Sequence, residues 1–169
     1  MPEIGESLVG AYLRLIRDCE IVTYNQRLSR KPGEMGETDV IGLDLDSSTV
    51  YLCEVVTHLR GLLYAGGNEG SLRRIGEKLR RAAQYSARAF PTHNRVLMLW
   101  APYVPRGYLT RGLEELREEL ERAGHDLELR INGEYAACVD ELRHLARQDT
   151  KNYGEPFFRV LQILEHLRQ

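Results

Sequence analysis

Two carboxylates, Asp39 and Glu54, lie within apolar segments and are the residues whose type and spacing point most directly to chemistry. The apolar, β-branched segments 38–43 and 49–57 flank a polar turn at 44–48, which predicts two antiparallel strands with a tight connection. Burying an acid is costly unless its charge is compensated, and two acids on paired strands repel each other. A divalent cation would relieve the repulsion, because Mg²⁺ prefers carboxylate oxygens and bridges them to phosphate. The sequence therefore predicts a metal site here; the alternative is that each acid meets solvent at a strand end.

Strand alternation assigns further residues to the faces that carry the two acids. Glu54 shares its face with Val56 and His58, because successive side chains point to opposite sides of a strand. His58 could act as a general base or as a proton donor to a leaving oxygen, or could be an ordinary surface histidine. Glu37 shares the face of Asp39 and is a candidate extra metal ligand.

Several short motifs along the first part of the chain occur in a recognisable order. They are Gly5-Glu6, Asn25-Gln26-Arg27, Gly36-Glu37-Thr38-Asp39-Val40-Ile41, Glu54-Val55-Val56 and Lys78. In order and spacing they resemble the PD-(D/E)XK nuclease superfamily, and most closely the small bacterial predicted endonucleases related to archaeal Holliday-junction resolvases. The resemblance covers about the first ninety residues and gives no account of the remainder.

The resemblance implies hydrolysis of phosphodiester bonds in nucleic acid, with DNA the expected substrate and a structure-selective endonuclease the expected enzyme. Mg²⁺, or Mn²⁺ in its place, would be the cofactor, held by Asp39 and Glu54. Glu6 or Glu37 would contribute through water. For Glu6 a structural role is equally open, since a carboxylate in the first turn of a helix is favoured by the helix dipole.

One departure from the superfamily pattern concerns the lysine that follows the strand carboxylate. Val56 occupies that position, and valine can neither orient the attacking water nor offset charge on the transition state. Lys78, on the next predicted helix, matches a helix lysine of the family and is the expected replacement. The departure also leaves open a catalytically inactive, nuclease-like protein that binds nucleic acid or other proteins.

A basic row follows the predicted helix 71–89. Arg74, Lys78, Arg81 and Tyr85 recur at intervals of three and four residues and so share one side of the helix. Such a row suits contacts with a phosphate backbone, although a charged row is as often a solvated helix face. Contacts of this kind would read the shape of a backbone and not its base sequence.

Composition limits the remaining possibilities. The 169 residues carry a net charge of −2, are 43% hydrophobic and 28% charged, and predict a single domain, with a core at about 1–102 and an extension at about 103–169. The balanced charge gives no global attraction to nucleic acid, so any phosphate-binding face must be local. There is no apolar run of membrane-spanning length and no signal-peptide pattern, which predicts a cytoplasmic protein without a membrane partner. Three cysteines without CxxC spacing are expected to be buried and reduced.

Periodicity predicts an α/β fold in which a mixed sheet is flanked by helices. The expected order is α-β-β-β-α-β, like the restriction-endonuclease core, followed by a C-terminal α-β-α-α extension. The predicted elements are helices at 3–18, 71–89, 108–123, 134–148 and 155–167, and strands at 19–25, 38–43, 49–57, 95–102 and 126–132. Helix 108–123 exposes a row of glutamates and is expected to lie away from nucleic acid. The last two helices need an apolar partner, either the sheet or a second subunit in a homodimer.

Overall fold

The secondary structure follows the predicted order of elements. The computed structural model describes residues 2–28, 36–59 and 66–168. Its elements are α1 (Ile4–Leu15), β1 (Ile21–Arg27), β2 (Glu37–Asp44), β3 (Thr49–Val55), α2 (Gly67–Ala89), β4 (Asn94–Ala101), α3 (Tyr108–Arg122), β5 (Asp126–Ile131), α4 (Gly133–Gln148) and α5 (Pro156–His166). The predicted α-β-β-β-α-β order and its α-β-α-α extension are both observed.

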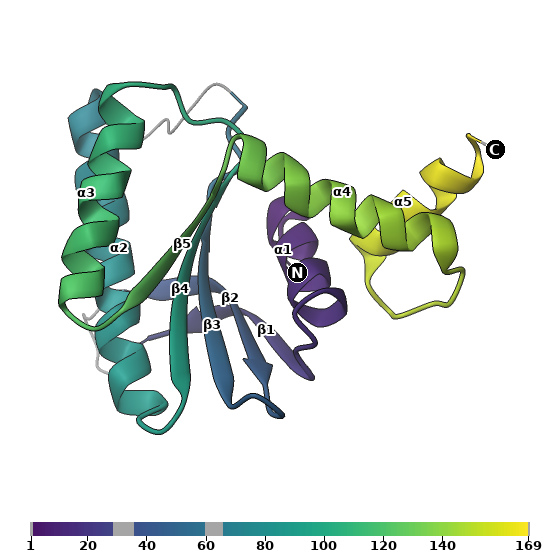
Figure 1. Ribbon diagram of the computed structural model, residues 1–169, viewed down its shortest axis with the longest axis horizontal. Helices are drawn as coiled ribbons and strands as arrows, with labels where there is room; N and C mark the ends of the chain where they lie inside the picture. The colour runs from purple at the N-terminus through teal and green to yellow at the C-terminus, as the bar shows by residue number, and fades with distance from the viewer. Residues whose placement is uncertain (1, 29–35, 60–65, 169) are drawn as a thin grey trace.

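The five strands form one mixed sheet in the order β1-β2-β3-β4-β5 (Figure 1). β1, β2 and β3 are antiparallel neighbours, and β4 and β5 run parallel to β3. The continuous apolar strand β4 lies inside the sheet, between β3 and β5, and β5 lies at its edge. The parallel part of the sheet is reached through α2 and α3, which return the chain to the start of each next strand.

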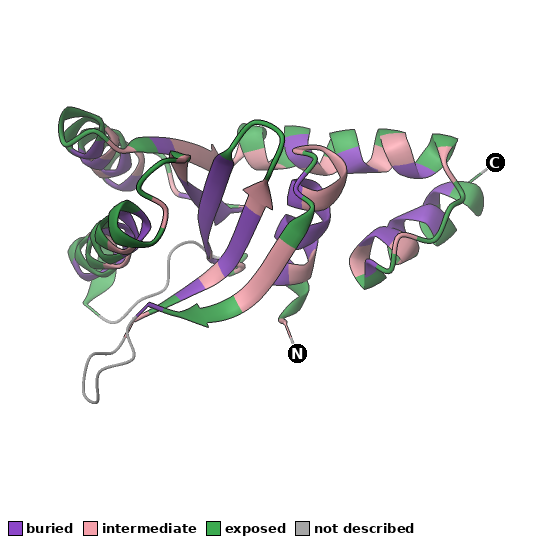
Figure 2. Cartoon of the chain, turned by 90° about the horizontal axis from the view of Figure 1, so that it is seen from below, coloured by how far each residue is buried: buried purple, intermediate pink, exposed green. Residues whose placement is uncertain are grey.

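Two helical layers cover the two faces of the sheet, with α2 and α3 on one face and α1 and α4 on the other (Figure 1). On the α2 side, Leu52 and Val56 pack with Ile75 and Leu79. On the α1 side, the fully buried Trp100 meets the ring of Tyr12 edge-on at 5.1 Å between centroids. Figure 2 shows how buried positions gather along the strands and on the helix sides that face them. The sheet therefore has two apolar faces, and an acid on either of them is costly.

The β2–β3 hairpin has the predicted pairing and turn. Val40 pairs with Cys53 at one end and Asp44 pairs with Thr49 at the other. The carboxylate of Asp44 accepts bonds from the backbone N–H and the hydroxyl of Ser47, which closes the turn. This local closure fixes the register, and the register decides which side chains share a face.

Helix α2 begins four residues earlier than the periodicity predicts. Gly66 has φ of +94° and precedes the first helical residue, Gly67. Gly67 is therefore the first residue of the helix and not part of the preceding loop. Glycine suits these two positions because it adopts left-handed backbone conformations without steric cost. The sequence HLRGLLYAGGNEG at 58–70 predicts a glycine-rich connection, of which residues 60–65 lie outside the described part of the chain, as does the turn predicted at Lys31-Pro32-Gly33.

The C-terminal helices cover α1 and each other. α4 packs against β5 and α1, and α5 packs against α4 and α1, which places α5 beyond the edge of the sheet (Figure 1). Glu165 of α5 is bound by Arg143 and Arg147 of α4 at 2.7 and 2.6 Å. The outer side of α5 exposes an apolar stripe made of Val160, Ile163, Leu164 and Leu167.

The structure bears on the predictions about the cysteines and about membrane-spanning segments. Cys19, Cys53 and Cys138 are all buried free thiols, as expected of cysteines without disulfide or zinc spacing. None of the helices in the described ranges combines the length and the apolar character that crossing a bilayer requires.

Candidate active site

Asp39 and Glu54 meet at the open end of the β2–β3 hairpin. The last regular pair of the two strands is Val40 with Cys53, and one further step along the same register places Asp39 opposite Glu54. At that step a side chain replaces the backbone ladder, because Oδ2 of Asp39 accepts a hydrogen bond of 2.7 Å from the N–H of Val55. The two acids thus converge on the sheet face covered by α2, because residues directly opposite each other in an antiparallel pair share a face.

Lys78 of α2 reaches the two acids from the opposing layer. Its Nζ lies 2.6 Å from Oε2 of Glu54 and 3.9 Å from Oδ1 of Asp39. The neighbouring Ile75 and Leu79 are buried in the core below, and this packing holds α2 in the orientation that presents the lysine. The Glu54 side chain is only 3% exposed, whereas that of Lys78 is 27% exposed, so the site opens to solvent past the lysine.

The electrostatics of the site reflect burial first and neighbouring charges second. The pKa of Glu54 is raised to about 7, chiefly by burial and then by the charge of Asp39, while Lys78 opposes the shift. Burial also raises the pKa of Asp39, against the lowering effects of Lys78 and of the Val55 amide. A carboxyl with a pKa near neutrality changes its charge over the physiological pH range, which is common at functional sites.

One oxygen of the acid pair is left unsatisfied. Oε1 of Glu54 is buried and has no hydrogen-bond partner among the described residues. Such an oxygen normally has a partner, so it is a natural ligand for a hard cation. The described ranges contain no group of three or more His, Cys, Asp or Glu side chains that could hold a metal. The residues present still fit Mg²⁺, which binds through one or two carboxylates and keeps several waters or phosphate oxygens.

Glu6 approaches the site from the other face of the sheet, on the first turn of α1. Its Oε2 accepts bonds from the backbone N–H of Glu3 at 2.8 Å and from Nδ2 of Asn25 at 3.3 Å, as in the first-turn role described above. The charge of Glu6 nevertheless raises the pKa of Asp39, so the two carboxylates interact electrostatically. Glu37 also raises that pKa from an exposed position in β2. The structure thus places both predicted outer acids near Asp39 without giving either a direct contact to it.

The other predicted residues are more peripheral. His58 follows β3 and is exposed, so the structure brings it into no described contact with the acids. Arg74 and Arg81 lie exposed on α2, one turn to either side of Lys78, and form the predicted row with it. Tyr85 is half-buried and packs edge-on against Phe90, which ties its ring to the core.

Two contributions to the site do not follow from residue types, although Asn25 itself belongs to one of the motifs of the sequence analysis. The backbone N–H of Val55 fixes the carboxylate of Asp39, and only the hairpin register could have pointed to it. Asn25 takes a left-handed conformation, with φ of +51°, at the step of β1 that lies opposite Asp39, where the regular pairing is interrupted. A positive φ at an asparagine in a strand is an uncommon conformation, and here the side chain turns to Glu6.

Comparison with known proteins adds no relative to this description. No family model matches the chain, and neither the curated proteins nor the solved structures include a significant match. The chemistry of the site therefore rests on its own geometry.

Proposed function

We propose that this chain is a metal-dependent phosphodiesterase that cuts nucleic acid, with DNA as the expected substrate and Asp39, Glu54 and Lys78 as its catalytic residues. The observation that carries the proposal is the convergence of the buried carboxylate of Glu54, the partly buried carboxylate of Asp39 and the ammonium of Lys78 at the end of the β2–β3 hairpin. The element order and this hairpin agree with a restriction-endonuclease-like core, and that attribution is part of the proposal.

Each residue has a role that follows from its position. Asp39 and Glu54 would hold Mg²⁺ or Mn²⁺, with the unsatisfied Oε1 of Glu54 as one ligand atom. When bound, such a cation acts as a Lewis acid toward the phosphoryl oxygens and lowers the pKa of a coordinated water. Lys78 is the most exposed of the three side chains, at 27% against 15% for Asp39 and 3% for Glu54, so its ammonium can approach a phosphate that enters the site. Its charge would stabilise the negative charge that develops during the reaction.

Contacts with the substrate backbone would come from the row on α2. Arg74 and Arg81 flank Lys78 on the exposed side of the helix, where each can reach a phosphate. Farther along the helix surface, Arg80 is held by Glu119 of α3 through two bonds of 2.8 and 2.7 Å. The glutamate-rich side of α3 thus begins next to α2 and would limit the substrate to the side of the Arg74–Arg81 row.

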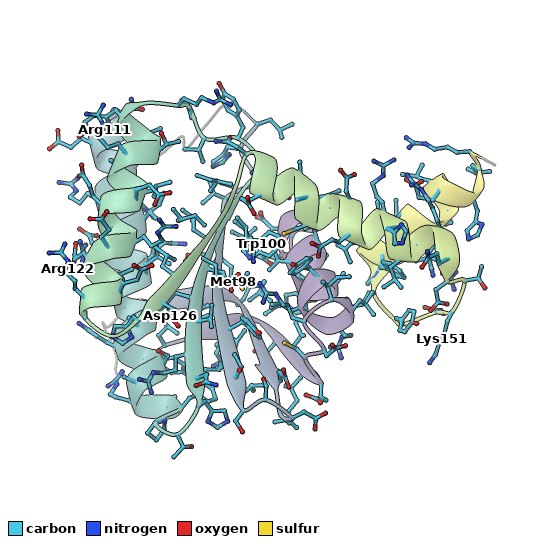
Figure 3. The ribbon with its side chains drawn as sticks, in the orientation of Figure 1. Met98, Trp100, Arg111, Arg122, Asp126 and Lys151 are labelled. Atoms are coloured by element: carbon cyan, nitrogen blue, oxygen red, sulfur yellow. The ribbon has the colours of Figure 1, made fainter. Side chains whose placement is uncertain are left out.

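The test is cleavage of supercoiled plasmid and of branched DNA in the presence of Mg²⁺ or Mn²⁺. Asp39→Asn, Glu54→Gln and Lys78→Met should each lower the rate by roughly a hundredfold or more. Asp126→Asn and Lys151→Ala change the same residue types at exposed positions far from the site and should cleave normally (Figure 3). Equal activity in the two sets of variants would refute the assignment of the site.

A second candidate function is favoured by the ion pair itself. Lys78 already compensates the charge of Glu54 without a cation, so the same three residues suit a protein that binds nucleic acid and does not cut it. In that case binding that weakens with salt would occur in EDTA, and no metal would produce cleavage.

The exposed apolar stripe of α5 favours the predicted homodimer as a property of either function. Val160, Ile163, Leu164 and Leu167 recur at helical spacing, and such a stripe is costly to leave in water. If two copies pair through it, Ile163→Glu should convert a dimer to a monomer in sedimentation velocity, and Glu141→Gln on α4 should not. A native protein that sediments as a monomer at all concentrations would exclude the dimer.

A further inference from the structure

A second surface with chemistry of its own lies where β4 passes into α3. Four side chains of this segment are exposed: Tyr103, Arg106, Tyr108 and Arg111, called here the tyrosine–arginine patch. The two rings are 49% and 55% exposed, an unusual state for large aromatic groups in a chain whose other described tyrosines are at least partly buried. None of the four belongs to the acid pair or to the basic row on α2.

The segment that carries the patch is held rigidly. Asn132, which follows β5, accepts a bond of 2.8 Å from the N–H of Val104 and donates one of 3.0 Å to its carbonyl. Val104 and Leu109 are buried, each 1% exposed. Arg106 and Tyr108 lie between these two buried residues and Tyr103 directly precedes Val104, so the backbone that carries both rings is anchored in the core.

The arginines of the patch carry uncompensated charge. Arg106 and Arg111 form no ion pair within the described ranges, whereas Arg117 of the same helix pairs with Glu114 at 2.6 Å. Exposed rings and exposed guanidinium groups in one short segment are the combination that binds single-stranded nucleic acid, because bases stack on the rings and phosphates contact the positive charge. Duplex DNA offers no free base faces to such rings.

The patch lies at the same end of the sheet as the acid pair. The N–H of Val56 donates to the carbonyl of Trp100 at 2.8 Å, so the end of β4 runs beside the strand that carries Glu54. Tyr103 follows Trp100 by three residues. Figure 3 shows Arg111 at the end of α3 near this side of the sheet and Arg122 at the opposite end. A strand lying over the patch would therefore be directed along the sheet end toward the acids.

We propose that the tyrosine–arginine patch binds the unpaired bases of a single-stranded nucleic acid by stacking on Tyr103 and Tyr108 while Arg106 and Arg111 contact its phosphates. The role of this surface in feeding a strand to the acids rests on the proposed function. The binding itself does not.

The test is fluorescence anisotropy with a labelled pyrimidine oligonucleotide of about 16 nucleotides and with the matching duplex, both in EDTA. Tyr103→Ala and Tyr108→Ala should each weaken single-strand binding about tenfold and leave duplex binding unchanged. Tyr103→Phe and Tyr108→Phe keep the ring and should bind like the native protein. The phenylalanine variants also separate stacking from any effect on folding, since they preserve the bulk of the side chain.

The salt dependence of binding tests the arginines separately from the rings. Arg111→Ala should reduce the slope of log affinity against log salt by about 0.7, because one phosphate contact is lost. Arg122→Ala removes the same charge from the far end of α3 and should leave the slope unchanged (Figure 3). Alanine and phenylalanine variants that bind alike, or an Arg122→Ala effect equal to that of Arg111→Ala, would overturn the proposal.

The outcome for the patch is separable from that for the acid pair. Metal-dependent cleavage that depends on Asp39 while the tyrosine variants bind normally would refute the patch alone. Ring-dependent binding in a protein that no metal activates would refute the phosphodiesterase alone.

Discussion

Lys78 and Glu54, 24 residues apart in sequence, form a hydrogen-bonded ion pair of 2.6 Å. The lysine comes from a helix, while the strand position two residues after Glu54 is filled by Val56, which is buried in the core beneath α2. A positive charge is thus supplied to the acids from the layer above the sheet and not from the sheet. Substitutions at Lys78 and Val56 can therefore test whether the positive charge must come from the helix.

The lysine should be transferable from helix to strand. Val56 lies on the same side of β3 as Glu54, so a lysine there would extend its ammonium toward the acids. If positive charge at this point is what catalysis needs, Lys78→Met should abolish DNA cleavage and Val56→Lys combined with Lys78→Met should recover a measurable part of it, by plasmid-nicking rate. Arg74→Met is the matched control on α2 and should reduce binding more than turnover.

Recovery in the double variant would identify the ammonium itself as the requirement. If Lys78→Met cleaves as fast as the native protein, the lysine only compensates a buried charge. Circular dichroism of each variant would show that the valine replacement, at a buried position, has not unfolded the chain.

The acid pair should make the protein less stable as the pH rises from about 4.5 to neutrality. Because burial raises the pKa of Glu54 to about 7, the folded state holds a proton that the unfolded state has already lost, so stability falls between about pH 4.5 and 7. Glu54→Gln removes this titration. In metal-free buffer the variant should gain on the native protein by roughly 2–3 kcal/mol between about pH 5 and 8, by urea denaturation.

Glu115→Gln, on the exposed side of α3, serves as the control for that measurement and should track the native curve. Adding Mg²⁺ should reduce the difference at high pH, because a cation that binds the ionised pair stabilises the folded state. A native protein whose stability is flat over the whole window would contradict the raised pKa.

The fold was accessible from the sequence because its elements are marked by strong local patterns. The apolar run of β4, the alternation of β2 and β3 and the apolar stripe of α2 each predict their element and its buried face, and all three are observed. The start of α2 was missed because two glycines usually indicate a loop, whereas here the left-handed Gly66 begins a helix. Element boundaries depend on such single dihedral angles, which composition does not reveal.

The candidate site was only partly accessible. Strand alternation predicts which neighbours share a face with Asp39 and which share a face with Glu54, and family resemblance suggested Lys78. That the two acids share one face depends on the register of β2 and β3, which the period of two does not give. The ion pairs that fix the C-terminal helices were not foreseeable, because they join residues such as Arg143 and Glu165 that are defined only by how α4 and α5 pack. The same holds for Asn132, whose role depends on a loop 28 residues away in sequence.

Gly5 should be needed to keep the first turn of α1 against the site. A Cβ added at Gly5 would lie 1.9 Å from Cγ2 of Thr57, so α1 touches the chain just after β3 at a point where any larger residue must displace it. Gly5→Ala should therefore move the adjacent Glu6, lower the melting temperature by several degrees and reduce cleavage. Thermal unfolding and plasmid nicking measure the two effects.

Gly133 at the start of α4 provides the contrast, since a Cβ there meets no atom within 4 Å. Gly133→Ala should melt at or above the native temperature. Thr57→Ser in the Gly5→Ala background removes the clashing methyl group and should restore part of the lost stability, since the contacts of 3.3 Å with Cβ of residue 57 and with Cγ1 of Val55 remain. A Gly5→Ala protein that is unaffected would show that the helix moves away without consequence.

The last two helices should separate in acid. Hydrogen bonds from Arg147 and Arg143 lower the pKa of Glu165 to about 2, below its ordinary value near 4.5. A carboxylate with a lowered pKa stabilises the folded state above about pH 4.5, and this contribution is lost as the pH falls toward 2. Amide hydrogen exchange in α5 should accordingly increase over that window, before exchange in β3 and β4 increases.

Glu165→Gln should cause the same local increase already at neutral pH, whereas Glu141→Gln, on the exposed side of α4, should not. If α5 and the central strands lose protection together at every pH, the α4–α5 ion pairs do not hold a separable unit, and the apolar contacts of Phe158 and Leu161 must be what ties α5 to the rest of the protein.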